Sequence, residues 1–288
     1  MKLVPYWHDT APRFQGCETG PVEGDYDVAV VGGGFTGLSA AIALARKGAS
    51  VVLLEADRLG GCASGRNGGM CNNGFAQDYA GMVGKLGAET SLRLYQSFNT
   101  AVDTVETLIR AENIDCDFQR VGKLKMAAKP AHYDKLARSH ELMVQGADPD
   151  ARLVSRAELG AEVGTDRYFG GLIFPHAAQM HMGKYVHGLA SAAARHGAHL
   201  HENSPVTGIR RLNGQAHRLT TPRGSVNARQ VLLATGTSAV GPLSWFRRRI
   251  VPVGAFLIVT EPLSREQLDA LVPGRRNATD TRNFVSYF

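Results

Sequence analysis

The sequence has 288 residues, of which 44% are hydrophobic and 20% are charged. This length suits about two domains, and the composition is ordinary for a globular protein with a sizeable core, which excludes disordered, fibrous and coiled-coil classes. The formal net charge is +6 at pH 7. The dense basic runs, at 247–249 and 275–276, have no interleaved aromatic residues, so we do not expect a nucleic-acid partner.

The cysteines and the N-terminal segment indicate the compartment. Cys17, Cys62, Cys71 and Cys116 show no CxxC spacing and no histidine at zinc-ligand spacing. Free thiols in a chain of this length favour a reducing compartment, and we expect no metal site. Residues 1–24 hold no apolar run of signal-peptide length, and no stretch of the chain approaches about 18 consecutive apolar residues. We therefore predict no membrane span and a cytoplasmic protein.

The first elements in chain order predict a βαβ unit. Residues 27–31 form a short apolar, β-branched run that is typical of a buried parallel strand. Glycines follow at once, and residues 38–47 predict an alanine-rich helix that ends at Gly48. A second apolar run at 50–54 predicts the next strand.

The middle and the end of the chain predict further helices and strands. After a glycine-dense loop at 60–69, apolar residues recur at three- and four-residue spacing from Leu92 to Ile109 and predict a long helix. Ser155 with Glu158 resembles a capping box that opens a short helix. Another helix is expected at 184–196, and strands are expected at 124–128, 206–210, 217–221, 231–234 and 250–260.

The loop after the first strand, residues 32–37 (GGGFTG), contains the pattern G-x-G-x-x-G. Gly32 permits the tight turn, Gly34 lets a pyrophosphate approach the backbone, and Gly37 lets the helix lie close to the strand. The helix N-terminus offers N–H groups and a partial positive charge to phosphates. Glu55, at the end of the second strand, can accept hydrogen bonds from a ribose and would repel the 2′-phosphate of NADP. Together these features predict dinucleotide binding.

The loop at 60–69 directly follows the second strand and narrows the choice of dinucleotide. Its small residues let the chain pass flat against a ligand, and Ser64 and Arg66 can donate to phosphate or ring oxygens. FAD proteins use such a loop to hold the pyrophosphate and to reach the flavin ring. The alternative interpretation is that residues 60–69 form a mobile surface loop without a ligand. The turn Thr235-Gly236, after the strand at 231–234, fits a strand whose end faces the cofactor.

At these residues the chain resembles the D-amino-acid-oxidase-type superfamily of FAD oxidoreductases, and within it the gamma-glutamylputrescine oxidase group. The matching segments are 6–10 (YWHDT), 32–37, 63–69 (ASGRNGG), 114–117 (IDCD), 166–168 (DRY), His181, 234–236 (ATG) and 280–283 (DTRN). The resemblance implies oxidation of a carbon–nitrogen bond in an amine or amino acid. In that family the substrate passes a hydride to flavin N5, the imine is hydrolysed, and oxygen or another acceptor reoxidises the flavin.

The motifs and the resemblance together define the expected fold. We predict an α/β protein with a Rossmann-like FAD-binding domain built from separated segments and interrupted by an α+β substrate domain. The expected ranges are 1–25 for an N-terminal leader, 26–90 and 180–245 for the FAD-binding domain, and 91–179 and 246–288 for the substrate domain. The family pattern continues beyond Phe288, so we interpret the chain as an N-terminal portion of the family fold.

The expected site follows residue by residue. The residues expected to bind FAD are Gly32, Gly34, Phe35, Thr36, Gly37, Glu55, Ala63, Ser64, Arg66, Asn67, Gly68, Gly69, Val206, Thr235 and Gly236. Relatives that attach flavin covalently through this loop have a histidine where Arg66 stands, so we expect FAD to bind non-covalently. Where the family has Gly-x-Gly, this chain has Gly60-Gly61-Cys62, and we expect Gly61 to absorb the turn.

The catalytic residues are not identified by the sequence. His181 is a candidate for the substrate pocket, and its alternative role is to cap or pack at the start of the helix that follows. Hydride transfer needs mainly a neutral amine, so no acid–base pair has to be visible. Two other hypotheses remain: a non-catalytic FAD-binding or nucleotide-binding fragment, and another flavin class such as a hydroxylase.

Overall fold

The computed structural model describes residues 2–212, 214, 216–237 and 241–288. Its internal contacts divide the chain into two compact units. Unit 1 contains Met1–Asn67, Ala111–Cys116 and His181–Leu257, and unit 2 contains Gly68–Arg110, Asp117–Met180 and Ile258–Phe288. Each unit is therefore assembled from separated stretches of sequence. The assignment of an FAD-binding and a substrate domain to these units stays a prediction.

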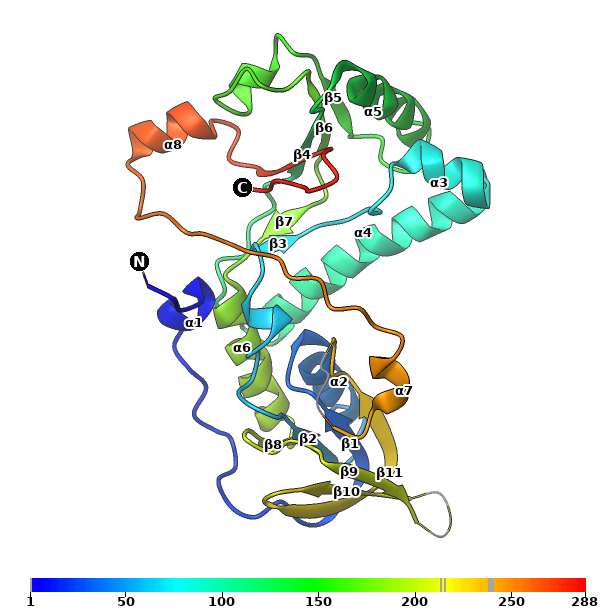
Figure 1. Cartoon of the computed structure of the whole chain (residues 1–288), viewed down its shortest axis with the longest axis vertical. Helices are drawn as coiled ribbons and strands as arrows, with labels where there is room; N and C mark the ends of the chain where they lie inside the picture. The colour runs from blue at the N-terminus through cyan, green and yellow to red at the C-terminus, as the bar shows by residue number, and fades with distance from the viewer. Residues whose placement is uncertain (1, 213, 215, 238–240) are drawn as a thin grey trace. The chain divides into compact units, whose positions relative to one another are not determined.

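Unit 1 is built around a six-stranded sheet in the order β8-β2-β1-β11-β10-β9. The strands β8, β2, β1 and β11 pair in parallel with their neighbours. Strand β10 pairs antiparallel with β11 on one side and with β9 on the other. In Figure 1 the blue strands from the start of the chain lie beside yellow strands from its later part. The strands are β1 Asp25–Val31, β2 Val51–Leu54, β8 His199–His201, β9 Gly208–Arg211, β10 His217–Thr221 and β11 Gly224–Leu233.

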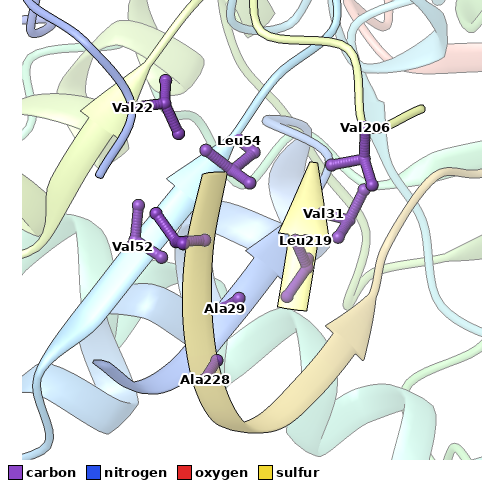
Figure 2. Packing of buried hydrophobic residues seen from close by; sticks show 9 residues of the cluster. Val22, Ala29, Val31, Val52, Leu54, Val206, Leu219 and Ala228 are labelled. Atoms are coloured by element: carbon purple, nitrogen blue, oxygen red, sulfur yellow. The ribbon is translucent and has the colours of Figure 1, made fainter. Parts of the chain in front are cut away.

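The two faces of this sheet are covered differently. Helices α2 (Phe35–Ala45) and α6 (Met182–Arg195) pack against each other, and α2 also packs on β1 and β2. On one face, side chains from β1, β2, β10 and β11 gather with Val22 and Val206 into the apolar cluster that Figure 2 shows. Burial of each large apolar side chain stabilises the fold by about 1.5–3 kcal/mol. Unit 1 also contains α1 (Tyr6–Thr10), the 3₁₀ turn η1 (Ala63–Gly65) and α7 (Ser244–Arg247).

Unit 2 has a four-stranded sheet in the order β12-β4-β6-β5. Its strands are β4 Lys123–Met126, β5 Arg152–Val154, β6 Gly171–Phe174 and β12 Asn277–Asp280, and β3 Met70–Cys71 pairs separately with β7 Ala178–Gln179. Its helices are α3 Tyr79–Leu86, α4 Ala88–Ala111, whose last residue belongs to unit 1, α5 Pro130–Met143 and α8 Arg265–Leu271, with the turn η2 at Leu159–Ala161. Leu124 and Met126 of β4 are buried, as their alternation with lysines predicts.

The predicted Rossmann-like α/β class is confirmed, and most expected elements form. The long helix α4 buries Tyr95, Val102 and Ile109 of the predicted face. Helix α2 begins at Phe35, three residues before the expected start, and β11 begins at Gly224 instead of residue 231. The expected strand at 206–210 forms at Gly208–Arg211.

One predicted strand is wrong. Residues 250–260 form no strand, and their side chains, including Val251, Phe256 and Ile258, are exposed. β-branched residues favour extended backbone, but a strand also needs a neighbour, and no sheet in the described ranges pairs with this segment. The predicted capping box forms, because Ser155 and Glu158 exchange hydrogen bonds, and the turn that follows leads into the short 3₁₀ helix η2 and not into an α-helix. Gly160 and Gly164 follow closely, and glycine disfavours helix propagation.

Candidate dinucleotide site

The glycine loop after β1 makes a close turn that requires glycine at two positions. Gly32 has φ +111°, and a Cβ atom there would lie 2.5 Å from the carbonyl oxygen of Ala234. At Gly37, in the first turn of α2, a Cβ atom would lie 1.9 Å from the Gly32 carbonyl oxygen. Strand, loop and helix are thus packed at backbone contact. The N-cap of α2 is Gly34, which has no side chain to cover the first turn.

Glu55 lies at the same edge of the sheet, just after β2. One carboxylate oxygen accepts a hydrogen bond from Gly33 N at 2.6 Å, and the other accepts one from Asp57 N at 3.0 Å. These bonds fix the carboxylate beside the glycine loop, because the ends of parallel strands meet at one edge. The position matches the one at which a carboxylate binds a ribose in dinucleotide sites.

The loop that follows β2 folds over the start of α2. Gly60 N donates to Gly33 O at 2.9 Å, and Phe35 N donates to Ser64 Oγ at 3.1 Å. The expectation that Gly61 absorbs the turn is wrong, because Gly60 has φ +66° while Cys62 keeps an ordinary φ of −101°. The Gly60 conformation satisfies the bond to Gly33, so Cys62 is not forced into the left-handed region.

The remaining predicted residues of this loop occupy different positions. The Asn67 side chain donates to Ala63 O at 3.1 Å and to Ser64 O at 2.9 Å, which closes the turn η1. Arg66 is exposed. Gly68 and Gly69 belong to unit 2, where Gly69 O accepts a hydrogen bond from Met180 N. Their contribution to cofactor binding stays a prediction.

The other predicted site residues come from the helix and from later strands. The Phe35 ring lies 5.3 Å from the Tyr185 ring of α6, and Thr36 is exposed. Ala234 N donates to Val31 O at 2.8 Å, so the Thr235-Gly236 turn follows the glycine loop at the same edge. The Val206 side chain is buried in the apolar cluster of Figure 2. The part that these residues have in cofactor binding remains a prediction.

His181 is the N-cap of α6. Its Nδ1 accepts a hydrogen bond from Lys184 N at 3.2 Å, and its Nε2 lies 2.8 Å from Thr10 Oγ1. The Thr10 hydroxyl donates to Tyr6 O at 2.7 Å, so it accepts the proton of His181 Nε2. These contacts match the capping alternative, and a role in the substrate pocket stays a prediction.

The leader residues Trp7 and His8 were not among the predicted site residues, although both contact the loop at 60–67. Trp7 Nε1 donates to Asn67 O at 2.7 Å, and His8 Nε2 lies 3.1 Å from Gly60 O. The sequence does show a tryptophan and a histidine in a short polar leader, which is a signal that these side chains make specific contacts. Their partners, however, are backbone carbonyls more than fifty residues along the chain. Sequence patterns do not identify such partners.

The donor set at this edge fits the ADP part of a dinucleotide. Phosphates bind at a helix N-terminus that is preceded by glycines, and a Cβ at Gly32 or Gly37 would remove the close turn. The Glu55 carboxylate is placed where it would accept from a ribose, and the Ser64 hydroxyl and the exposed Arg66 would be polar donors in the adjoining loop; these roles stay predictions. In the described ranges no group of three or more His, Cys, Asp or Glu side chains could hold a metal ion. None of the helices within those ranges is long and apolar enough to cross a membrane.

A parallel sheet whose central strand leads through a glycine turn into a helix, with an acid at the end of the next strand, defines a dinucleotide-binding protein. The family model of FAD dependent oxidoreductases (DAO) matches residues 27–288. The chain belongs to this FAD-dependent oxidoreductase family, which confirms the resemblance seen in the sequence.

Individual relatives agree with this assignment. The chain is 32% identical over 267 residues to "Probable oxidoreductase OrdL" of Haemophilus influenzae, covering 91% of this chain and 62% of the relative. It is 32% identical over 264 residues to "Gamma-glutamylputrescine oxidoreductase" of Escherichia coli, covering 91% and 61%. The chain therefore spans about three fifths of the length of these curated relatives. The crystal structure of glycine oxidase from Geobacillus kaustophilus superposes with a TM-score of 0.61 at 26% identity, covering 74% of this chain and 56% of that one.

Proposed function

We propose that this protein is an FAD-dependent oxidoreductase that oxidises the carbon–nitrogen bond of an amine or amino acid. The carrying observation is the meeting of the glycine turn, the Glu55 carboxylate and the Ser64 loop at one edge of the unit 1 sheet. Membership of the FAD-dependent family supports the cofactor. When bound, FAD supplies the hydride acceptor, and the substrate leaves as an imine that water hydrolyses.

The protein's own contribution is to hold the cofactor. The N–H groups at the start of α2 and its partial positive charge would bind the pyrophosphate, and Glu55 would accept the ribose hydroxyls. We propose that binding is non-covalent, because an arginine side chain at residue 66 forms no bond to a flavin. Oxygen or another acceptor would regenerate the oxidised cofactor. The cytoplasmic location stays a prediction.

For the substrate we propose an amine of the gamma-glutamylputrescine type. The support is the 32% identity to the Escherichia coli protein of that name over 91% of this chain. The glycine oxidase of Geobacillus kaustophilus, at 26% identity, supports the alternative of a small amino acid. The two alternatives differ in charge and length, so a substrate panel separates them.

The test is reconstitution of the 288-residue chain with FAD, followed by anaerobic addition of substrate. We expect the flavin absorbance to bleach with gamma-glutamylputrescine and to remain with glycine or NADH. Bleaching by glycine and not by gamma-glutamylputrescine would show that the substrate is a small amino acid and would contradict the proposed substrate class. If the chain binds FAD and no amine or amino acid bleaches it, the non-catalytic FAD-binding alternative is correct. Acid precipitation should release all flavin into the supernatant if binding is non-covalent.

A further inference from the structure

The leader helix α1 (Tyr6–Thr10) packs against the cofactor loop instead of extending away from unit 1. Trp7 and His8, adjacent in sequence, each reach a backbone carbonyl at opposite ends of the loop 60–67. The distances are 2.7 Å from Trp7 Nε1 to Asn67 O and 3.1 Å from His8 Nε2 to Gly60 O. The two side chains therefore hold both ends of this loop.

The His8 contact continues into the glycine turn. Because a carbonyl only accepts, Nε2 of His8 carries the proton that Gly60 O receives. Gly60 N in turn donates to Gly33 O at 2.9 Å, and Gly33 N donates to Glu55 at 2.6 Å. Burial, together with nearby Arg58, lowers the pKa of His8 despite the bond to Gly60. The lowered pKa favours the neutral ring, which donates through Nε2 alone.

The Trp7 contact reaches the other side of the same turn. Asn67, whose carbonyl accepts the indole N–H, donates from its side chain to Ser64 O at 2.9 Å. The Ser64 hydroxyl oxygen then accepts from Phe35 N, the first N–H of α2, at 3.1 Å. Two hydrogen-bonded routes thus connect α1 with the two sides of the pyrophosphate-facing turn.

Close backbone packing fixes α1 in this place. A Cβ atom at Gly183 of α6 would lie 2.1 Å from Trp7 O, and one at Gly65 would lie 2.2 Å from His8 Nε2. Thr10 Oγ1 accepts from the His181 ring at 2.8 Å, and the Trp7 and His181 rings meet edge to face at 4.9 Å. The surface on which α1 packs is therefore formed by residues that are far from it in sequence.

We propose that the N-terminal leader is a clamp on the cofactor loop, with Trp7 and His8 as positioning residues that set how fast FAD leaves. This inference rests on the proposed FAD site, and it assigns a role in FAD binding to residues outside the glycine loop 32–37. The clamp holds the loop in the shape that covers the start of α2. When it opens, the loop loosens and the pyrophosphate loses its cover.

The test measures FAD release from the holo form of the full chain, followed by recovery of flavin fluorescence after dilution. Trp7→Phe keeps an aromatic side chain but removes the indole N–H together with part of the ring volume, and His8→Ala removes the second donor. We expect each change to speed release about threefold to tenfold, as expected for one lost hydrogen bond. His8→Gln keeps a donor at similar reach and should restore most of the wild-type rate.

Two further variants separate clamping from general stability. Gly183→Ala leaves the sequences of the leader and of the loop unchanged. Its methyl group would lie 2.1 Å from Trp7 O and displace α1, so FAD release should speed up as in the leader variants. Lys2→Ala removes an exposed ion pair between Lys2 and Asp9 and should leave release unchanged. All rates are measured well below the melting temperature of each variant. Release rates of Trp7→Phe, His8→Ala and Gly183→Ala within twofold of wild type would overturn the clamp.

Amide hydrogen exchange of the apo chain tests the clamp without the cofactor. We expect residues 60–67 to exchange faster in Trp7→Phe and His8→Ala than in wild type, and unchanged exchange there would refute the clamp. If the wild-type chain does not bind FAD, the proposed function fails, and this exchange measurement alone decides whether the leader holds the loop.

Discussion

Replacing Gly37 with alanine should separate cofactor binding from folding. A Cβ atom at residue 37 would lie 1.9 Å from the Gly32 carbonyl oxygen, 1.5 Å short of an ordinary 3.4 Å contact. The Cβ is attached directly to the backbone of α2 and the oxygen belongs to the backbone of the glycine turn, so the start of α2 must move away from that turn. Overpacking of this kind costs about 1–3 kcal/mol, and the better helix propensity of alanine returns about 1 kcal/mol. The net cost is about 0–2 kcal/mol, which at about 2–4 °C per kcal/mol lowers the melting temperature of the apo chain by at most about 8 °C.

The effect on FAD should be much larger than the effect on stability. A shift of this size breaks the alignment of the α2 N–H groups with the pyrophosphate. Loss of two charge-assisted hydrogen bonds, each about 1.5 kcal/mol, weakens binding about 100-fold. The assay is FAD titration by fluorescence quenching, with thermal melting of the apo chain alongside.

The matched control is the same substitution at Gly84 in α3. A Cβ atom there has nothing within 4 Å, so Gly84→Ala should stabilise the chain by about 0.5–1 kcal/mol and leave FAD affinity unchanged. If Gly37→Ala bound FAD within threefold of wild type, the close approach would not be what shapes the site.

Two carboxylates give further predictions. Glu55→Gln should weaken FAD binding about tenfold, because a neutral amide makes weaker hydrogen bonds to ribose than a carboxylate, and titration of both proteins checks this. Glu112→Gln should destabilise the chain by about 2 kcal/mol in urea unfolding, because the buried carboxylate pairs with Arg46 and Arg195. The loss is smaller than for a fully buried ion pair, because the two arginines are half-exposed and regain water when the pairs are lost. Burial alone would raise the pKa of Glu112, but its bonds to His196 and the arginines outweigh it and hold the pKa below the usual value of 4.5. The gap between wild type and Glu112→Gln should therefore be full above pH 4.5 and shrink as the pH falls below it; a constant gap would contradict this.

The βαβ unit could be predicted from the sequence because its signals are local. The apolar run at 27–31, the glycine turn and Glu55 lie within about thirty residues, and each has a direct physical meaning for backbone conformation or ligand contact. The long helix α4 was predictable for the same reason, since its apolar face repeats with helical period.

The parts that could not be predicted depend on distant partners. The segment 250–260 has strand-like residues but no strand neighbour in the described ranges, and residue type alone does not show this. Gly60, and not Gly61, takes the left-handed conformation because Gly60 N bonds to Gly33 across the loop. The contacts of Trp7 and His8 join α1 to residues more than fifty positions away.

The central strand of the unit 1 sheet also has a consequence for synthesis of the chain. Strand β1 ends at Val31 and pairs with β2 on one side, but its partner on the other side, β11, begins only at Gly224. At 5–20 residues per second a ribosome needs about 10 to 40 s to add the 192 residues between them. During that time one edge of an apolar strand lacks its native neighbour, which is a template for wrong pairing. Faster translation between those two strands would shorten this exposure, and a chaperone bound to the nascent chain would cover the free edge of β1.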